Sequence, residues 1–387
     1  MLRYLRMEYY IVNIIAATMI EYLPLKRINE PYVHAADEVL QSGWYLRGEA
    51  TSRFEEHYAK YIGTRHCVGC GNGLDALTLI LRAYKEMGVM HDGDEVIVPA
   101  NTYIASILAI TENRLVPVLV EPDINTLQID DTLIEQAITP RTRAIMIVHL
   151  YGRCAYTTTI DDICRRHGLR LIEDNAQAHG CRATTPVASS SGKTGSLGHA
   201  AAHSFYPTKN LGAFGDAGAV TTDDDELAAI IRALGNYGSA RHYIFDYLGR
   251  NSRMDELQAA ILDAKLRNLE ADNQRRRMIA SIYINKVRNS GIWIPQCHRD
   301  SVYHIFPILC ERRDALRQYL SDHGVQTEIH YPIPPHKQQC YANNYATKHS
   351  ILPITERIHA QELSLPCHPA MTDAEANHVA ELLNSFT

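Results

Sequence analysis

Lys209 stands between a short aromatic run and a glycine-rich loop, in the segment 204-SFYPTKNLGAFGDAGAV-220. A lysine that lies in a pocket can have a lowered pKa and can form a Schiff base with a carbonyl compound. Asp174 ends the apolar segment 170-RLIED-174. At the C-terminal end of a parallel strand it would lie where open α/β sheets bind ligands, next to a pyridinium nitrogen or a metal. The alternative is an aspartate that caps the following turn.

Glycines precede a helical pattern in the segment 71-GNGLDALTL-79. Free backbone N–H groups and the helix dipole make such a start an anion site of the kind that phosphates use. Many helices begin this way, and the spacing matches neither the P-loop nor the Rossmann fingerprint. Together with Lys209 and Asp174, the segment completes the three features that pyridoxal phosphate requires, namely a Schiff-base lysine, a carboxylate for the pyridinium and a phosphate site.

Short apolar runs alternate with helical patterns from about residue 65 onward. The predicted strands lie at 95–99, 115–120, 144–150, 170–174, 201–206 and 217–222. The predicted helices lie at 74–87, 131–138, 159–168 and 225–234. This alternation is typical of an α/β fold, and the near-continuous Val and Ile runs indicate a mostly parallel sheet covered on both faces.

The pattern changes after residue 250. A stretch without proline or glycine, 254–287, predicts one long helix that can run from one domain into the next. The remainder predicts strands at 302–310 and 326–331 and helices at 312–324 and 372–386, the last beginning in a capping box. We therefore expect a large domain over residues 19–265 and a smaller α+β domain over 266–387.

The composition excludes several classes of protein. A chain of 387 residues, 46% hydrophobic and 21% charged, is typical of a soluble globular protein with two domains. The net charge of -6 and the absence of a basic block argue against nucleic acid as a partner. Nine scattered cysteines indicate a reducing, cytoplasmic location. Cys67 and Cys70 form the only close pair, which predicts buried thiols rather than a metal site.

The N-terminus resembles a weak signal peptide, with Arg3 and Arg6 before the apolar run 9–20. That run is shorter than the ~20 residues of a membrane-spanning helix, so no membrane partner is expected. Met19 opens a stretch that reads like an ordinary start. The hypothesis is that residues 1–18 are an N-terminal extension.

Ordered motifs connect these observations to a known family. They are 43-GWYLRGEATSRFEE-56, 73-GLDAL-77, 94-DEVIVPANTYIAS-106, 172-IEDNAQAHG-180, 195-GSLGHAAAHSFYPTKNLGAFGDAGAV-220, 251-NSRMDELQAAIL-262 and 330-HYPIPPHKQ-338. From about residue 20 to its end the chain resembles the DegT/DnrJ/EryC1/StrS sugar aminotransferases, which have the type I fold of aspartate aminotransferase. The resemblance implies pyridoxal phosphate as the cofactor and a large domain with a seven-stranded, mostly parallel sheet.

The resemblance also implies roles around the cofactor ring. Lys209 would form the Schiff base and then move protons as the general acid–base catalyst. Asp174 would hold the pyridinium N–H, Gln177 would bond the ring hydroxyl, and Tyr103 would stack on the ring.

The phosphate would be held by Ser204 and by the backbone around Gly73 and Leu74. Asn251 of the partner subunit would also reach it, so the resemblance implies a homodimer with shared active sites. One departure is His199, where the family often has aspartate; it lies away from the expected cofactor contacts.

The implied reaction moves an amino group from L-glutamate to a nucleotide-linked keto-sugar, in amino-sugar biosynthesis for a surface polysaccharide or glycan. Lysine rather than histidine at 209 separates the chain from a dehydrating branch of the family. The segments 148-VHLYG-152 and 330-HYPIPPHKQ-338 favour a dTDP-linked 3-keto-6-deoxyhexose. The alternatives are a 4-keto-sugar, a cyclitol, or a regulatory protein that binds the cofactor.

Three further residues are candidates for contacts with the sugar nucleotide. Tyr331 and His336 stand in a proline-rich loop, and Tyr45 stands in the SGWYLRG segment. Loop residues held by a rigid scaffold often bind ligands. The alternative for all three is ordinary packing.

Overall fold

The computed structural model describes residues 19–185, 187, 189, 191–241, 243–296, 300–342 and 351–387. The hypothesised extension, 1–18, lies outside these residues. A seven-stranded sheet forms the centre, with the order β1-β7-β6-β5-β4-β2-β3. The strand β7 is antiparallel to its neighbours β1 and β6, and the other pairs are parallel. The strands are β1 (His66–Cys70), β2 (Glu95–Pro99), β3 (Val116–Val120), β4 (Thr142–Val148), β5 (Arg170–Asp174), β6 (Ala200–Ser204) and β7 (Gly218–Thr222).

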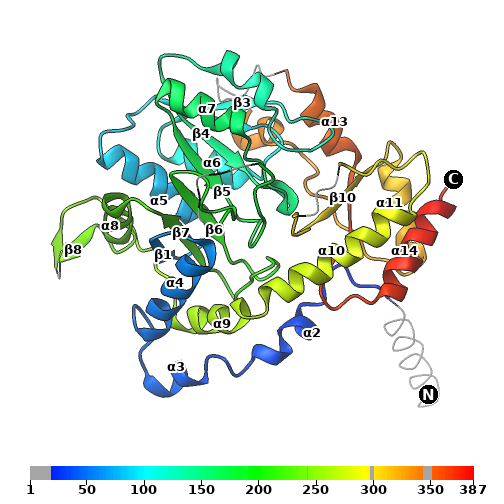
Figure 1. The fold of residues 1–387 in the computed structure, drawn as a ribbon, viewed down its shortest axis with the longest axis horizontal. Coiled ribbons are helices and arrows are strands. Elements are labelled where there is room, and N and C mark those ends of the chain that lie inside the picture. Colours follow the sequence, from blue (N-terminus) through cyan, green and yellow to red (C-terminus); the bar gives the residue numbers. More distant parts are fainter. Residues whose placement is uncertain are drawn as a thin grey trace.

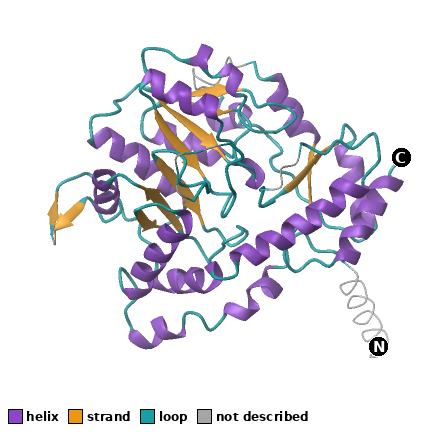
Figure 2. Cartoon of the chain, viewed as in Figure 1, coloured by secondary structure: helices purple, strands orange, loops and turns teal. Residues whose placement is uncertain are grey.

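Helices cover both faces of this sheet (Figures 1 and 2). In β2, Val96 and Val98 belong to the core under α5, whereas Ile97 belongs to the core on the opposite face, beside α7. This alternation follows from the two-residue period of a strand and explains the continuous apolar runs. The helices around the sheet are α4 (Glu49–Ile62), α5 (Gly73–Glu86), α6 (Ile104–Glu112), α7 (Thr158–His167), α8 (Asp225–Leu234) and α9 (Glu256–Leu266).

The C-terminal residues build a second core, which lies beyond the sheet along α10 (Figure 1). Tyr283 and Phe306 pack there at a ring-centroid distance of 5.0 Å. Ile20 joins this core from the beginning of the described chain. The elements are α10 (Leu269–Lys286), β10 (Phe306–Leu309), α11 (Arg313–Asp322), α13 (Pro353–Gln361), β11 (Glu362–Leu365) and α14 (Asp373–Ser385). The domain boundary at residue 265 stays a prediction.

Smaller elements complete the chain. A hairpin of two short strands projects beyond α8 (Figure 1). These elements are α2 (Leu25–Asn29), α3 (Asp37–Ser42), β8 (Ser239–Arg241), β9 (Ile244–Phe245) and the 3₁₀ turns Glu30–Tyr32, Asp131–Leu133, Glu135–Ala137, Leu150–Gly152, Pro335–Lys337 and Gln339–Tyr341.

The predicted single helix 254–287 is wrong, because the chain turns between α9 and α10. The Asn268 backbone has φ -104° and ψ -6°, and its side chain donates to the Tyr32 hydroxyl at 2.8 Å. Asparagine competes for hydrogen bonds in this way and is a weak helix former. The turn lets α9 pack with the sheet-side core, which includes Leu262, while α10 packs with the second core.

Three other predicted elements are corrected. The strand 302–310 shrinks to β10, because Val302 donates its N–H to Gly152 and Tyr303 has φ +42°. Segment 326–331 forms only an isolated bridge between Glu328 and Ser364. Segment 131–138 forms two 3₁₀ turns instead of an α-helix. Several elements were not predicted, among them the strands β1 and β11 and the helices α4, α6 and α13.

Within the described ranges, every helix is too short or too polar to span a lipid bilayer. The same residues hold no cluster of three or more His, Cys, Asp or Glu side chains with metal-binding geometry. Cys67 and Cys70 are buried free thiols, which agrees with the prediction for that pair.

Candidate active site

A cavity of about 380 Å³ opens at the C-terminal ends of the parallel strands. Its wall contains the last residues of three of them, Val148 of β4, Asp174 of β5 and Ser204 of β6. The N-terminus of α5 forms another part of the wall, and loops from the C-terminal half supply His304 and Tyr331. The site therefore lies where open α/β sheets bind ligands.

Lys209 lines this cavity from the loop that follows β6. Its backbone N–H donates to the Tyr206 carbonyl at 2.8 Å, which holds the turn that carries the side chain. Burial lowers the pKa of the Lys209 ammonium to about 8, and the negative charge of Asp174 opposes this shift. A lysine with this pKa supplies a substantial fraction of the neutral amine near pH 8, as a nucleophile and a general base require.

Asp174 is 6% exposed and lines the same cavity. One carboxylate oxygen accepts the Ser106 hydroxyl at 2.8 Å, and the other accepts the Ala176 N–H at 3.2 Å. Burial raises the pKa of the carboxyl above its usual range, while these bonds and the charge of Lys209 act in the opposite direction. A buried carboxylate of this kind stabilises a cation placed beside it. Turn capping by Asp174, the alternative reading, is present as well, through Ala176.

The N-terminus of α5 meets the end of β6 at very close range. Asn72 caps the helix by accepting the Asp75 N–H at 2.8 Å. The Gly73 and Leu74 N–H groups have no acceptor among the described residues, as expected in the first turn of a helix. A Cβ atom on Gly73 would lie 2.5 Å from the Ser204 Cβ, so glycine leaves these two N–H groups and the Ser204 hydroxyl around one small space. That donor set fits a phosphate.

Two aromatic side chains, Tyr103 and Tyr331, form a further part of the cavity wall. The Tyr103 and Tyr331 rings lie 4.9 Å apart between centroids, tilted by 37°. The Tyr331 hydroxyl accepts the Gln177 side-chain amide at 3.0 Å, and the Gln177 carbonyl oxygen accepts the Tyr151 N–H at 2.6 Å. These bonds fix the Gln177 amide plane and leave one of its two N–H donors for a ligand.

The structure does not bring three predicted residues to this cavity. Asn251 is exposed and accepts a bond from Arg253 at 2.9 Å. Tyr45 is 50% exposed on the segment between α3 and α4. His336 is buried and pairs with Glu356 at 3.3 Å. The cavity of this chain is therefore lined by Tyr331 but by neither of the other two candidates for sugar contacts.

The predicted site left out several residues, among them one serine that bonds Asp174 and two histidines of the cavity wall. Ser106 stands three residues after Tyr103, and helical spacing from Tyr103 would have placed it one turn into the helix, on the same side. His304 and His330 line the cavity from loops of the C-terminal half. His330 opens the motif 330–338, whereas nothing local in the sequence identifies His304. The approach of both histidines to Lys209 depends on how the C-terminal half packs on the sheet.

The GSLG stretch of the family motif has a structural role next to the site. Glu173 is fully buried and accepts the N–H groups of Gly195, Leu197 and Gly198 at 2.7 to 2.8 Å. A Cβ atom on Gly198 would lie 2.7 Å from the Leu171 carbonyl oxygen. The loop therefore surrounds the Glu173 carboxylate, and glycine at position 198 allows the loop to approach the backbone of β5 closely.

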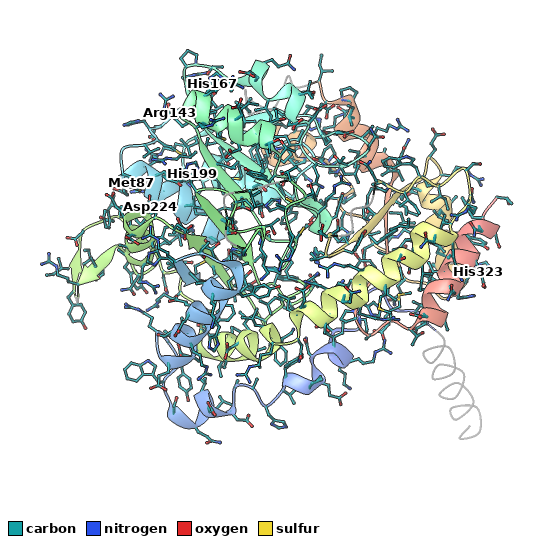
Figure 3. The ribbon with its side chains drawn as sticks, in the orientation of Figure 1. Met87, Arg143, His167, His199, Asp224 and His323 are labelled. Atoms are coloured by element: carbon teal, nitrogen blue, oxygen red, sulfur yellow. The ribbon has the colours of Figure 1, made fainter. Side chains whose placement is uncertain are left out.

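His199 follows this loop and precedes β6, so it lies at the opposite end of that strand from Ser204 (Figure 3). Its ring accepts the Leu171 N–H at 2.9 Å. His199, the departure from the family pattern, is not among the residues that line the cavity.

Comparison with known proteins connects this geometry to a family. The family profile of the DegT/DnrJ/EryC1/StrS aminotransferases matches residues 26–384. The chain belongs to the DegT/DnrJ/EryC1/StrS aminotransferase family. The predicted family is confirmed.

Two relatives and one solved structure show how far the similarity extends. The chain is 50% identical to dTDP-3-amino-3,6-dideoxy-alpha-D-galactopyranose transaminase from Aneurinibacillus thermoaerophilus, over 95% of this chain and 99% of the relative. It is 46% identical to the erythromycin biosynthesis sensory transduction protein EryC1 from Saccharopolyspora erythraea, over 91% and 94%. S. venezuelae DesV, solved in complex with a ketimine intermediate, superposes with a TM-score of 0.89 at 42% identity, over 95% of this chain and 98% of DesV.

These matches confirm the predicted fold class, the aminotransferase activity and pyridoxal phosphate as the cofactor. The residues of this DegT-family site fit that cofactor on their own geometry. Lys209 offers an amine of lowered pKa, Asp174 a buried carboxylate, and the start of α5 with Ser204 a cradle for the phosphate. The Tyr103 side chain is 50% exposed and lines the same cavity, where it can stack on an aromatic ring.

Proposed function

We propose that this protein transfers the amino group of L-glutamate to C3 of a dTDP-linked 3-keto-6-deoxyhexose. The observation that carries the proposal is the convergence of Lys209, Asp174 and the α5 N-terminus on one cavity of about 380 Å³. The substrate class rests on the relatives, since the transaminase from A. thermoaerophilus is named for a dTDP-3-amino sugar and is 50% identical over nearly its whole length.

The residues divide the chemistry between them. Bound pyridoxal phosphate supplies an aldehyde for the amino group and a ring that accepts electrons. The Lys209 Nζ accepts the proton from the substrate carbon and returns it, and the lowered pKa of Lys209 suits both directions. Asp174 stabilises positive charge on the ring nitrogen. The Gly73 and Leu74 N–H groups and the Ser204 hydroxyl anchor the phosphate.

A homodimer completes the site in this proposal. Asn251 is exposed and outside its own chain's cavity, which is the placement expected of a residue that serves the neighbouring subunit. Tyr45 lies on an exposed segment with Trp44 and is proposed to reach the sugar nucleotide in the same way. The eight described cysteines are free, which supports a reducing cytoplasm. Amino sugars for a surface polysaccharide, such as lipopolysaccharide, are the proposed end product.

Product analysis tests the substrate assignment. The enzyme would be incubated with L-glutamate and either a dTDP-3-keto or a dTDP-4-keto sugar, and NMR would locate the new amino carbon. We expect a 3-amino product from the 3-keto sugar and no comparable turnover of the 4-keto sugar. A 4-amino product would replace this proposal with the 4-keto alternative.

A second candidate function is regulation without turnover, and the name of the EryC1 relative favours it. The Lys209 cavity is compatible with both candidate functions, because a regulatory sensor would also bind the cofactor. A measurement of turnover distinguishes the enzyme from the sensor. Lys209→Ala should abolish amination while the parent protein aminates the sugar; a variant that keeps the parent rate would overturn the mechanism.

A further inference from the structure

A second cavity, of about 390 Å³, adjoins the Lys209 cavity. The two share Thr208, His304 and His330 in their walls, so the second cavity begins next to Lys209. The role proposed above for the Lys209 cavity does not use this space. It extends toward α10 and the second core, where Arg276 and Cys367 line it.

Arg276 is a buried cation in the wall of this second cavity. It is 4% exposed, and its Nη1 donates to the carbonyl oxygens of Tyr303 and Cys367. Its Nε is buried without a hydrogen-bond partner, and its Nη2 has no acceptor among the described residues. Asp272, one helical turn earlier, attracts the guanidinium, but the hydrogen bonds of Arg276 among the described residues go to backbone carbonyls and not to this carboxylate. Burial accordingly lowers the pKa of Arg276.

A buried guanidinium with unused N–H donors destabilises the folded protein unless an anion pairs with it. The rest of the wall does not supply one at close range. His304 and His330 are neutral, since burial lowers their pKa values, that of His330 to about 4. Glu328 is the one carboxylate in this wall, and it is exposed. The remaining donors of Arg276 match a carboxylate, which takes two N–H groups of one guanidinium.

We propose that Arg276 binds the side-chain carboxylate of a dicarboxylic amino donor, and so selects glutamate. The donor's amino group must lie at Lys209, and its α-carboxylate is attached to the same carbon, so both stay in the first cavity. The side-chain carboxylate lies further along the molecule and extends past Thr208 and His304 into the second cavity. This inference rests on the proposed function, because it assigns the donor of that reaction.

The donor half-reaction provides the test. Holoenzyme would be mixed with L-glutamate or L-alanine, and the loss of cofactor absorbance from its aldehyde form would be followed by stopped flow. Alanine has no side-chain carboxylate, so the rate of its half-reaction depends on all the other features of the site and not on recognition of that group. For Arg276→Gln we expect a loss of about 30-fold or more in kcat/KM with glutamate, the size typical of removing one partner of a buried charged pair. With alanine the change should be less than about threefold.

Arg275→Gln is the matched control. Arg275 is adjacent on α10, but it donates to the Met371 carbonyl and to Asp373, outside the second cavity. This variant removes the same charge and should keep the parent preference for glutamate. Arg276→Lys is the second variant if Arg276→Gln does not fold. It keeps a charge but loses the paired donors, and it should lose about tenfold with glutamate alone.

Binding of glutarate, measured by calorimetry on the parent holoenzyme, gives a readout that needs no turnover. Glutarate should compete with glutamate, and its affinity should fall in the Arg276 variants, whereas the affinity for dTDP should not. The assignment would be overturned by any of three results in the Arg276 variants. These are equal losses of kcat/KM with glutamate and alanine, an unchanged preference for glutamate, or a loss of dTDP affinity in place of glutarate affinity. Failure of the sugar half-reaction with an intact glutamate half-reaction would count against the proposed function and not against Arg276.

Discussion

Ser204 lies so close to Gly73 that a Cβ atom on the glycine would stand 2.5 Å from the Ser204 Cβ. The contact joins the end of β6 to the start of α5, and it forms the proposed phosphate cradle from two segments that are far apart in the sequence. A side chain at position 73 therefore cannot be added without moving one of them.

Gly73→Ala should weaken cofactor binding. Overpacking at such a contact costs about 1–3 kcal/mol, which corresponds to roughly a 5-fold to 150-fold higher Kd for pyridoxal phosphate. Fluorescence titration of the cofactor-free variant measures this Kd. Gly291→Ala is the control, because a Cβ atom there would meet only the Asn289 Oδ1 at 3.3 Å, in a loop that does not line the cavity. An unchanged Kd for Gly73→Ala would remove the cradle assignment.

Ser106→Ala should move the acid limb of the pH–rate profile. The Ser106 hydroxyl stabilises the ionised form of Asp174, whose pKa burial raises. A hydrogen bond to a charged group contributes about 1.5 kcal/mol, so its loss should shift the acid limb upward by about one pH unit. The profile of kcat/KM against pH gives this directly. Ser106→Thr, which keeps the hydroxyl, should restore the parent profile; equal shifts in both variants would contradict the assignment.

Lys209→Met should stabilise the cofactor-free protein below pH 8. The folded pKa of Lys209 is about 8, whereas an unfolded lysine titrates near ~10.4. The unfolded chain therefore binds more protons between these values, and stability of the parent rises with pH across that window. The parent is therefore less stable than the variant by the full amount below pH 8, and this difference in the free energy of unfolding disappears above about pH 10. Thermal unfolding of both proteins from pH 7 to 10 measures it, and a gap that does not narrow would refute this pKa.

Glu362→Gln should stabilise the protein between neutral and weakly alkaline pH. Glu362 is fully buried, accepts the His330 N–H at 2.6 Å and bonds the Ser364 hydroxyl. Burial raises the pKa of Glu362 to about 8, above the ~4.3 of an unfolded glutamate. Stability of the parent therefore falls as pH rises from ~4.3 to 8, because the unfolded chain releases the proton first.

Glutamine can keep both contacts without this titration, because its Oε1 accepts the His330 N–H and its Nε2 donates to the Ser364 hydroxyl, which reverses that one bond. The Tm difference between Glu362→Gln and the parent should therefore grow from pH 4.5 to 8 and then stay constant. Activity at pH 7 should be retained, because His330 keeps its backbone partner beside the cavity. A variant whose Tm falls below the parent at every pH would show that Glu362 is needed as a carboxylate.

The sequence by itself determined the chemistry of the site. Lys209, Asp174 and the glycines around residue 73 could be read as a cofactor site because each follows a strand or starts a helix. The carboxyl ends of parallel strands lie at one edge of the sheet, so residues that follow those strands come close together there in any loop conformation. The capping box of Thr372 and Glu375 was equally readable, because its two bonds connect residues three apart.

Tertiary structure alone decided which distant residues reach that site. Tyr331 lines the Lys209 cavity while His336, five residues later in the same motif, turns to Glu356. Asn268, where the predicted helix breaks, bonds the distant Tyr32 hydroxyl, and Arg276 of α10 shares the wall of the second cavity with His304 and His330. These contacts join residues far apart in sequence, and their geometry is set by the packing of two cores on each other, which no local pattern encodes.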